Sequence, residues 1–166
     1  MFGIKVHPAQ LFQHTGRNLD RITSLLSRFD RIILMTRRDK LGQAISRTIA
    51  EATNIWFNDG SEVQLSAAEQ RRLVPAIARN LAMCIEDESA VLEIRRRVVR
   101  PLIRVAYEDI EETPHEVFQE ITAFLSGGIA DTLDEGNEFP TPEKPAGITA
   151  GELRRLFLAS IQGHRL

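Results

Sequence analysis

The stretch with the most potential chemistry in this sequence is Thr36 to Ser46, which reads Thr-Arg-Arg-Asp-Lys-Leu-Gly-Gln-Ala-Ile-Ser. It follows a short apolar segment, so it is expected to lead from the end of a strand into a helix. A helix start at the carboxyl edge of an open α/β sheet offers unpaired N–H groups to an anion. Arg38 stands at that point, and Ser46 follows eight residues later, a little over two helical turns and near the same face. Arg38 and Ser46 could therefore bind a phosphate-type anion together.

A second interpretation of this stretch needs no ligand. Arg37, Arg38 and Lys40 could be ordinary solvated side chains where a helix begins, with their charges facing water. Residue spacing alone favours this simpler interpretation, so support for an anion site has to come from the rest of the chain.

Other residue types that often carry chemistry show no comparable pattern. The four histidines are scattered without the spacing of metal ligands, so no metal site is expected. His7 follows the first expected strand and could act there as a general base, although an exposed surface histidine is the simpler interpretation. Cys84 is the single cysteine, which excludes an internal disulfide, fits a reducing compartment and is typical of a small core residue.

Strands and helices alternate along the chain. Three short segments rich in β-branched or alternating apolar residues are expected to be strands, namely residues 2–6, 31–36 and 102–107. Elsewhere apolar residues recur at helical spacing, which predicts helices. These helices cover residues 19–29, 41–52, 66–97, 113–126 and 148–161. The alternation predicts an α/β fold, with a largely parallel sheet and flanking helices.

Local signals mark several element boundaries. Ser66 followed three residues later by Glu69 is a capping box that opens the long helix, and Pro75 inside that helix predicts a kink or break. Gly127 is typical of the end of a helix. Residues 129–147 are rich in Gly, Pro, Asp and Glu, which predicts an extended surface loop.

Length and composition limit the possible classes of protein. A chain of 166 residues predicts a single domain over residues 1–166. The 21 Lys and Arg against 23 Asp and Glu give a net charge of −2, so the chain as a whole has no basic field for nucleic acid or an anionic membrane. No apolar run approaches the roughly 20 residues of a membrane span, and the amino terminus lacks a secretory-signal pattern. We therefore expect a cytoplasmic protein that binds no nucleic acid.

The order of motifs around the 37–46 stretch is distinctive. Glu51-Ala52-Thr53 and Trp56 follow it, and Tyr107-Glu108-Asp109-Ile110 comes after the long helix. This order resembles the bacterial carbohydrate sulfotransferases of the trehalose 2-sulfotransferase type, over about residues 1–126. The resemblance implies a P-loop-like sulfotransferase fold.

The resemblance also implies a cofactor and roles for four residues. Members of this family transfer a sulfuryl group from 3′-phosphoadenosine 5′-phosphosulfate (PAPS) to a sugar or glycolipid hydroxyl. In sulfotransferases an Arg and a Ser eight residues apart bind the 3′-phosphate of the cofactor, and Arg38 and Ser46 match them. Tyr107 would lie against the adenine, and Trp56 would line the acceptor pocket or a dimer interface. Without the resemblance, both aromatic residues fit equally well as packing residues.

Some parts of the family pattern are missing from this sequence. The family begins with a strand and a Ser/Gly-rich loop that cradles the 5′-phosphosulfate, then a proposed catalytic Glu, and neither the loop nor the Glu has a counterpart here. We therefore expect an N-terminally truncated sulfotransferase domain whose catalytic residues are unknown. Without the central strand, the strands at 31–36 and 102–107 should pair directly or gain a strand from elsewhere, which predicts a homo-oligomer or a partner chain.

Two functions remain open from the sequence. One is transfer of a sulfuryl group from PAPS to a carbohydrate or glycolipid hydroxyl, by an enzyme or an inactive fragment of one. The alternative is a non-catalytic nucleotide-binding or partner-interaction protein. Because positioning and charge stabilisation supply most of the rate in such transfers, we expect no appreciable turnover by this chain alone.

Overall fold

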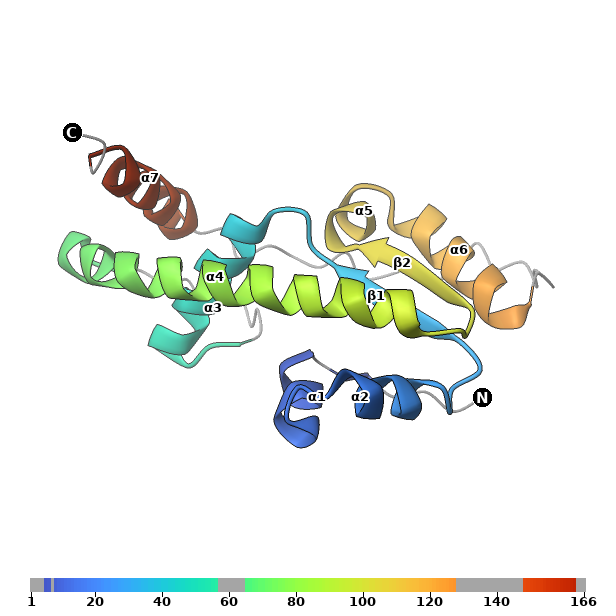
Figure 1. Cartoon of the computed structure of the whole chain (residues 1–166). Helices are drawn as coiled ribbons and strands as arrows, with labels where there is room; N and C mark the ends of the chain where they lie inside the picture. Colours follow the sequence, from blue (N-terminus) through green and yellow to red (C-terminus); the bar gives the residue numbers. More distant parts are fainter. Residues whose placement is uncertain (1–4, 7, 57–64, 128–147, 164–166) are drawn as a thin grey trace. The chain divides into compact units, whose positions relative to one another are not determined.

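The computed structural model describes residues 5–6, 8–56, 65–127 and 148–163 (Figure 1). In chain order the described elements are α1 (Pro8–Thr15), α2 (Leu19–Leu26), β1 (Ile32–Thr36), α3 (Lys40–Thr53), α4 (Ala67–Arg97), β2 (Leu102–Ala106), α5 (Tyr107–Glu112), α6 (Pro114–Ser126) and α7 (Ile148–Gly163). The chain divides into two compact units. The sheet unit draws on Met1–Thr36 and Glu86–Thr141, and the helical unit draws on Arg37–Ile85 and Pro142–Leu166.

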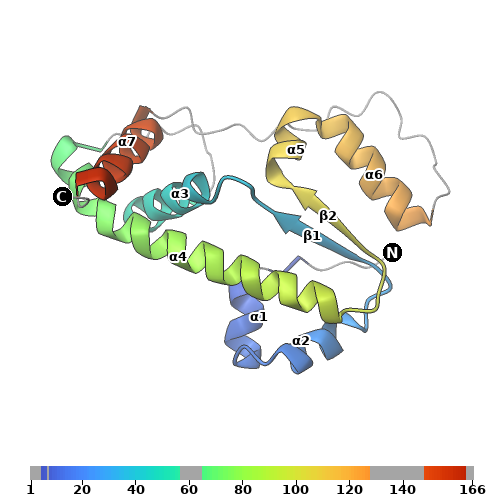
Figure 2. The same ribbon diagram turned by 45° about the horizontal axis from the view of Figure 1, so that its top comes forward.

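In the described part of the chain, β1 and β2 form a parallel two-stranded sheet (Figure 2). They pair in register from Ile32 opposite Leu102 to Thr36 opposite Ala106, so both strands end level at one carboxyl edge. Val105 and Ala106 are buried, and α5 and α6 pack against β2. A parallel sheet with flanking helices confirms the expected α/β class. Direct pairing of these two strands is one of the two arrangements that the sequence predicted.

A small apolar cluster joins the other helices of the sheet unit. Phe12 of α1, Ile22 of α2 and Ile94 near the end of α4 are buried together. Asn18 caps α2 by accepting a hydrogen bond from the Arg21 N–H at 3.0 Å. The last turns of α4 are thereby fixed to both amino-terminal helices.

Arg31 fastens the end of α6 beside the start of β1. Its guanidinium donates to the carbonyls of Phe124 and Leu125, and Cζ lies 5.7 Å from the centroid of the Phe124 ring. A cation at a helix C-terminus is also favoured by the helix dipole. Gly127 ends α6 with a φ of 79°, and a Cβ there would lie only 2.9 Å from Arg31 Nη2. The predicted helix end at Gly127 is confirmed, because both the backbone conformation and the Arg31 contact require glycine.

In the helical unit, α3 and α7 pack over an apolar core that α4 completes. The buried members of this core are Ile45, Ile77, Leu153 and Phe157. Beside it, Asn80 of α4 is fully buried and donates to Thr48 Oγ1 and to Glu51 Oε2 of α3, both at 3.0 Å. Burial raises the pKa of the Glu51 carboxyl, but hydrogen bonds from Asn80 and Arg47 outweigh it, so the pKa lies below its ordinary value. Polar as well as apolar contacts therefore fix α3 against α4.

Most helix predictions are confirmed by the structure. The capping box forms, because the Ser66 N–H donates to Glu69 Oε2 at 2.8 Å and the Glu69 N–H donates to Ser66 Oγ at 3.4 Å. The helices expected at 41–52 and 113–126 are α3 and α6, and Cys84 is buried as predicted. Local chemistry was sufficient to place these elements.

Four features differ from the sequence-based expectations. α4 continues through Pro75, so of the predicted kink or break the break is wrong and a kink stays a prediction. Both Pro75 and Arg71 are exposed, so the Arg71 carbonyl that loses its helical partner can be solvated. Lys5 and Val6 lie in no strand, and the remainder of the strand expected at 2–6 lies outside the described residues. Tyr107 begins α5 instead of ending β2, and neither α1 nor α5 was predicted.

Two expectations about the whole chain have different outcomes. Among the described helices, none combines the length and apolar character needed to cross a bilayer. A single domain over 1–166 stays a prediction, and the loop expected at 129–147 lies outside the described residues.

Candidate functional site

The candidate site starts in the three residues that connect β1 to α3. Asp39 is the N-cap of α3, and its Oδ1 accepts a hydrogen bond from the Gly42 N–H at 2.9 Å. The Arg38 carbonyl accepts from the Lys40 N–H at 3.0 Å. The expectation that this helix start offers unpaired N–H groups is therefore wrong at Lys40 and Gly42, because the chain already supplies their partners. An anion here has to be bound mainly by side chains.

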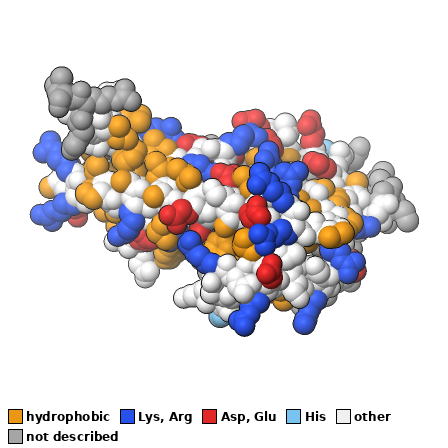
Figure 3. Space-filling view, viewed as in Figure 1, with side chains coloured by type: hydrophobic (Ala, Val, Ile, Leu, Met, Phe, Trp, Pro, Cys, Tyr) orange, Lys and Arg blue, Asp and Glu red, His pale blue; other side chains and the backbone are white. Residues whose placement is uncertain are grey.

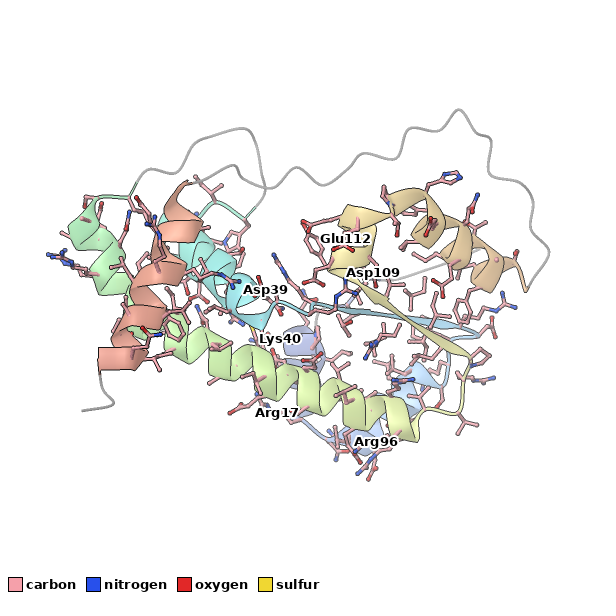
Figure 4. All side chains as sticks on the ribbon, turned by 90° about the horizontal axis from the view of Figure 1, so that it is seen from above. Arg17, Asp39, Lys40, Arg96, Asp109 and Glu112 are labelled. Carbon is pink, nitrogen blue, oxygen red and sulfur yellow. The ribbon has the colours of Figure 1, made fainter. Side chains whose placement is uncertain are left out.

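The second carboxylate oxygen of Asp39 is held from α7. Arg154 Nη2 donates to Asp39 Oδ2, and Figure 4 shows Asp39 and Lys40 at the start of α3. Burial raises the pKa of the Asp39 carboxyl, but the Gly42 hydrogen bond and the charges of Arg154 and Arg37 outweigh it. The pKa of Asp39 therefore lies below its ordinary value, and the carboxylate is ionised at neutral pH.

The Asp39 carboxylate also limits which residue can stand at position 42. A Cβ at this position would lie 2.5 Å from Asp39 Oδ2 and 3.4 Å from Arg154 Nη2. No larger residue fits while Asp39 caps the helix and binds Arg154. The first turn of α3 is thus built around one aspartate, one glycine and one arginine.

Arg38 and Ser46 both lie on this part of the helical unit. Arg38 is exposed in the connection, directly before the Asp39 cap. It also interacts with other groups of the protein. Ser46 is exposed in α3, about 9 Å along the helix axis from Lys40 at 1.5 Å per residue. Residues four apart share a helix face, so Ser46 lies on the same face as Gly42. The two predicted phosphate-binding residues are therefore both exposed, one directly before the Asp39 cap and one in α3.

The two predicted aromatic site residues belong to other segments of the chain. Tyr107 belongs to the sheet unit, where it is half-buried as the first residue of α5, directly after β2. Trp56 follows α3 at the end opposite Arg38, two residues beyond the C-cap Asn54, which has a φ of 59°. Its exposed fraction of 57% is that of a surface residue, which leaves its ring open to a ligand or a partner.

The remaining sequence candidates add no second site. His7 lies outside the described residues. No group of three or more His, Cys, Asp or Glu within the described part of the chain is placed to hold a metal ion.

Comparison with known proteins decides the family. A family model described as Stf0 sulphotransferase matches residues 5–136. The chain belongs to this family. No curated protein and no solved structure matches the chain.

Family membership confirms the resemblance seen in the sequence and makes sulfuryl transfer the broad chemistry of the group. The matched residues include Arg38, Ser46, Trp56 and Tyr107. α7 lies beyond them, so the residue that holds the Asp39 cap comes from outside the family-matched stretch. The helix start therefore lies within the matched residues, whereas Arg154, which supports it, does not.

Sequence analysis missed two residues of this site. Asp39 could have been found, because an aspartate directly before an apolar helical repeat is a standard N-cap signal. Arg154 gave no such signal, since it is 115 residues from Asp39 and only tertiary packing brings it there.

Proposed function

We propose that this chain binds PAPS at the start of α3 and acts in the transfer of its sulfuryl group to a carbohydrate or glycolipid hydroxyl. The observation that carries the proposal is the exposure of Arg38 before the capped start of α3 and of Ser46 within α3, in a chain of the Stf0 sulphotransferase family. Arg38 would form a charge-assisted hydrogen bond with the 3′-phosphate, and the Ser46 hydroxyl would donate a second one.

The Asp39–Arg154 pair supports this role electrostatically. An ionised carboxylate beside a phosphate would weaken binding by like-charge repulsion. Arg154 pairs with Asp39 and so offsets that charge, while Asp39 continues to hold the helix start. The pair lets the chain use an aspartate cap next to an anion site.

The remaining family roles are carried by the aromatic residues. In this proposal Tyr107 lies against the adenine, and Trp56 contacts the acceptor or a second subunit. In the reaction, an acceptor oxygen forms a bond to sulfur while the bond from sulfur to the 5′-phosphate oxygen breaks, and a base takes the acceptor proton. Cations and N–H groups stabilise the charge on the transferring group. We assign no base among the described residues.

One observation favours the alternative of nucleotide binding without catalysis. β1 leads into α3 through only Arg37–Asp39, and β2 leads directly into α5. Neither described strand is followed by a glycine-rich loop of the kind that wraps a phosphosulfate group. Among the described residues, the proposed 3′-phosphate contacts have candidates in Arg38 and Ser46, whereas the phosphosulfate group has no candidate loop.

The test of the binding site is a calorimetric titration with two nucleotides. 3′-Phosphoadenosine 5′-phosphate should bind more tightly than adenosine 5′-phosphate, which lacks the 3′-phosphate. Arg38→Ala should weaken binding of the first roughly 10- to 100-fold, because a charged hydrogen bond contributes about 1.5–3 kcal/mol, and leave the second unchanged. Ser46→Ala should have a smaller effect in the same direction.

Arg71→Ala is the matched control, because Arg71 is an exposed cation of the same unit that belongs to α4. Equal affinity of wild type and Arg38→Ala for the 3′-phosphorylated nucleotide would refute the site. Mass-spectrometric detection of a sulfated sugar after incubation with PAPS then separates the two functions. Sulfated product supports the enzyme, and nucleotide binding without product supports the alternative.

A further inference from the structure

The sheet unit carries a second cationic region, which we call the arginine patch. It consists of Arg21 and Arg28 from α2 and its following turn, Arg96 and Arg97 from the last turn of α4, and Arg100 from the connection to β2. All five are exposed. Figure 3 shows basic side chains over α2 and the end of α4, and Figure 4 labels Arg96 there.

Specific contacts hold the two halves of the patch together. Arg97 Nη1 lies 3.1 Å from Asp20 Oδ1, and Arg100 Nε donates to the Ser27 carbonyl at 2.9 Å. The end of α4 and the connection after it are thereby fixed to α2. The arginine patch is therefore held together by contacts within the sheet unit, between segments that lie far apart in the sequence.

The surface beside Arg21, Arg28 and Arg97 is hollowed. One depression of about 480 Å³ is lined by Asn18, Asp20, Arg21, Ser24, Leu25 and Arg28. A neighbouring one shares Asp20 and Ser24 and adds Thr23, Ser27 and Arg97. Arginine and hydroxyl donors, together with the Asp20 carboxylate, therefore line two adjoining hollows.

The charge of the patch exceeds what its own carboxylates balance. Asp20 pairs with Arg97, and Glu93 pairs with Arg96 and Arg97. Within the part of the chain that the structure describes, Arg21, Arg28 and Arg100 form no ion pair with a carboxylate. In a chain whose net charge is −2, this local excess is a region of positive potential that attracts an anionic partner.

Two apolar side chains stand among these cations. Val99 lies between Arg97 and Arg100 and is 94% exposed, and Leu25 lies between Arg21 and Arg28 and is 36% exposed. An exposed valine contributes nothing to the stability of the fold. Apolar side chains flanked by arginines are typical of surfaces that lie on a bilayer, where arginines bind phosphate groups and apolar tips enter the interface.

We propose that the arginine patch docks the protein on a bilayer that contains anionic phospholipids. Arg21, Arg28, Arg96, Arg97 and Arg100 bind the headgroup phosphates, and Val99 enters the interfacial region. The patch lies beside the start of β2, whereas both strands end at the opposite edge of the sheet. Docking therefore leaves the carboxyl edge of the sheet clear of the bilayer.

The experiment is co-sedimentation of the full chain with unilamellar vesicles. Vesicles of phosphatidylglycerol and phosphatidylcholine should bind the chain at least roughly tenfold more strongly than phosphatidylcholine alone, since each basic residue near an anionic surface adds to the attraction. Raised salt should weaken this binding.

Two triple variants give the decisive comparison. R21Q/R28Q/R96Q removes three exposed charges but leaves the Arg97 and Arg100 contacts in place, and should weaken vesicle binding roughly tenfold or more. R71Q/R72Q/R155Q makes the same change in net charge at exposed arginines of the helical unit, and should bind as wild type does. Val99→Ser keeps every charge and should also weaken binding, most clearly at raised salt.

Nucleic acid is the competing anionic partner and is tested in parallel with a labelled duplex DNA. Equal losses of vesicle binding in the two triple variants, together with unchanged binding by Val99→Ser, would overturn the proposal. Binding of the duplex by wild type without binding to the anionic vesicles would overturn it in favour of a nucleic-acid surface.

Discussion

The two places where a strand of this sheet leads into a helix are built very differently. After β1, Asp39 caps α3 with its side chain, Arg154 holds the cap, and α3 runs for 14 residues with four of them buried. After β2, the N-cap Ala106 makes no side-chain hydrogen bond, and α5 has six residues, none of them buried. The first junction is held by a side-chain cap and an ion pair, whereas the second has no side-chain cap and depends on the packing around it.

This difference bears on what each junction can do. A binding residue works best when its own position is fixed by packing and by a second layer of hydrogen bonds. Arg38 and Ser46 stand on such a fixed helix start. Tyr107 begins a short helix whose N-cap makes no side-chain hydrogen bond, so its position depends more on the surrounding packing.

The largest expected effect comes from removing the packing beneath the first junction. Leu153→Ala empties a fully buried position next to Ile45 of α3, and should lower the free energy of unfolding by about 2–5 kcal/mol. Ile110→Ala in the half-buried α5 should cost only about 1 kcal/mol. Urea unfolding followed by circular dichroism measures both. Similar costs for the two variants would contradict the contrast between the junctions.

The cap of α3 should contribute less than its packing. Asp39→Ala removes the hydrogen bond to the Gly42 N–H and should cost about 1 kcal/mol of stability. Asp39→Asn keeps a good N-cap and should recover most of that loss. Thermal denaturation of the three proteins gives the comparison, and an Asn variant as unstable as the Ala variant would show that the cap bond is not the source of the effect.

The charge of Asp39 should make stability depend on acid pH. The pKa of this carboxyl is below its ordinary value of 3.8 in the folded chain, so its contribution is present above pH 3.8 and is lost as the pH falls through the folded pKa. The stability difference between wild type and Asp39→Asn should therefore shrink below pH 3.8. Urea unfolding at a series of pH values tests this, and a difference that grows as the pH falls would reverse the sign.

The smallest expected effect is the coupling between Gly42 and Arg154. An exposed ion pair contributes about 0.2–1 kcal/mol, so Arg154→Gln should cost that amount in wild type. Gly42→Ala moves the Asp39 carboxylate away, so Arg154→Gln should cost nothing in that background. A double-mutant cycle from chemical unfolding measures the coupling, and additive costs would show that Gly42 and Arg154 act independently.

Much of the fold could be predicted because its signals are local. The apolar runs of β1 and β2, the Ser66 capping box and the Gly127 helix end each depend on a few neighbouring residues. α5 was missed because Tyr107 continues the apolar pattern of β2, and nothing in the sequence shows that the backbone turns there. Tertiary context decided that boundary.

The Asp39–Arg154 contact and the arginine patch could not be predicted from the sequence. Arg38 and Ser46 are predicted as binding residues from their spacing and a family resemblance, whereas Arg154 is joined to Asp39 only in the folded chain. The arginine patch was hidden for a related reason. A net charge of −2 says nothing of how folding gathers the arginines of α2 with those after α4.

The pairing of β1 with β2 also sets an order of events during synthesis. The Thr36 hydroxyl of β1 lies 3.4 Å from the carbonyl of Val105 in β2, which is 69 residues later in the chain. At the usual rate of translation, β2 leaves the ribosome about 4–14 s after β1, whereas a helix forms in about a microsecond. The apolar segment Ile32–Met35 therefore waits for its partner while α3 and α4 are made, and the nascent chain is most exposed to aggregation and most dependent on chaperones during that interval.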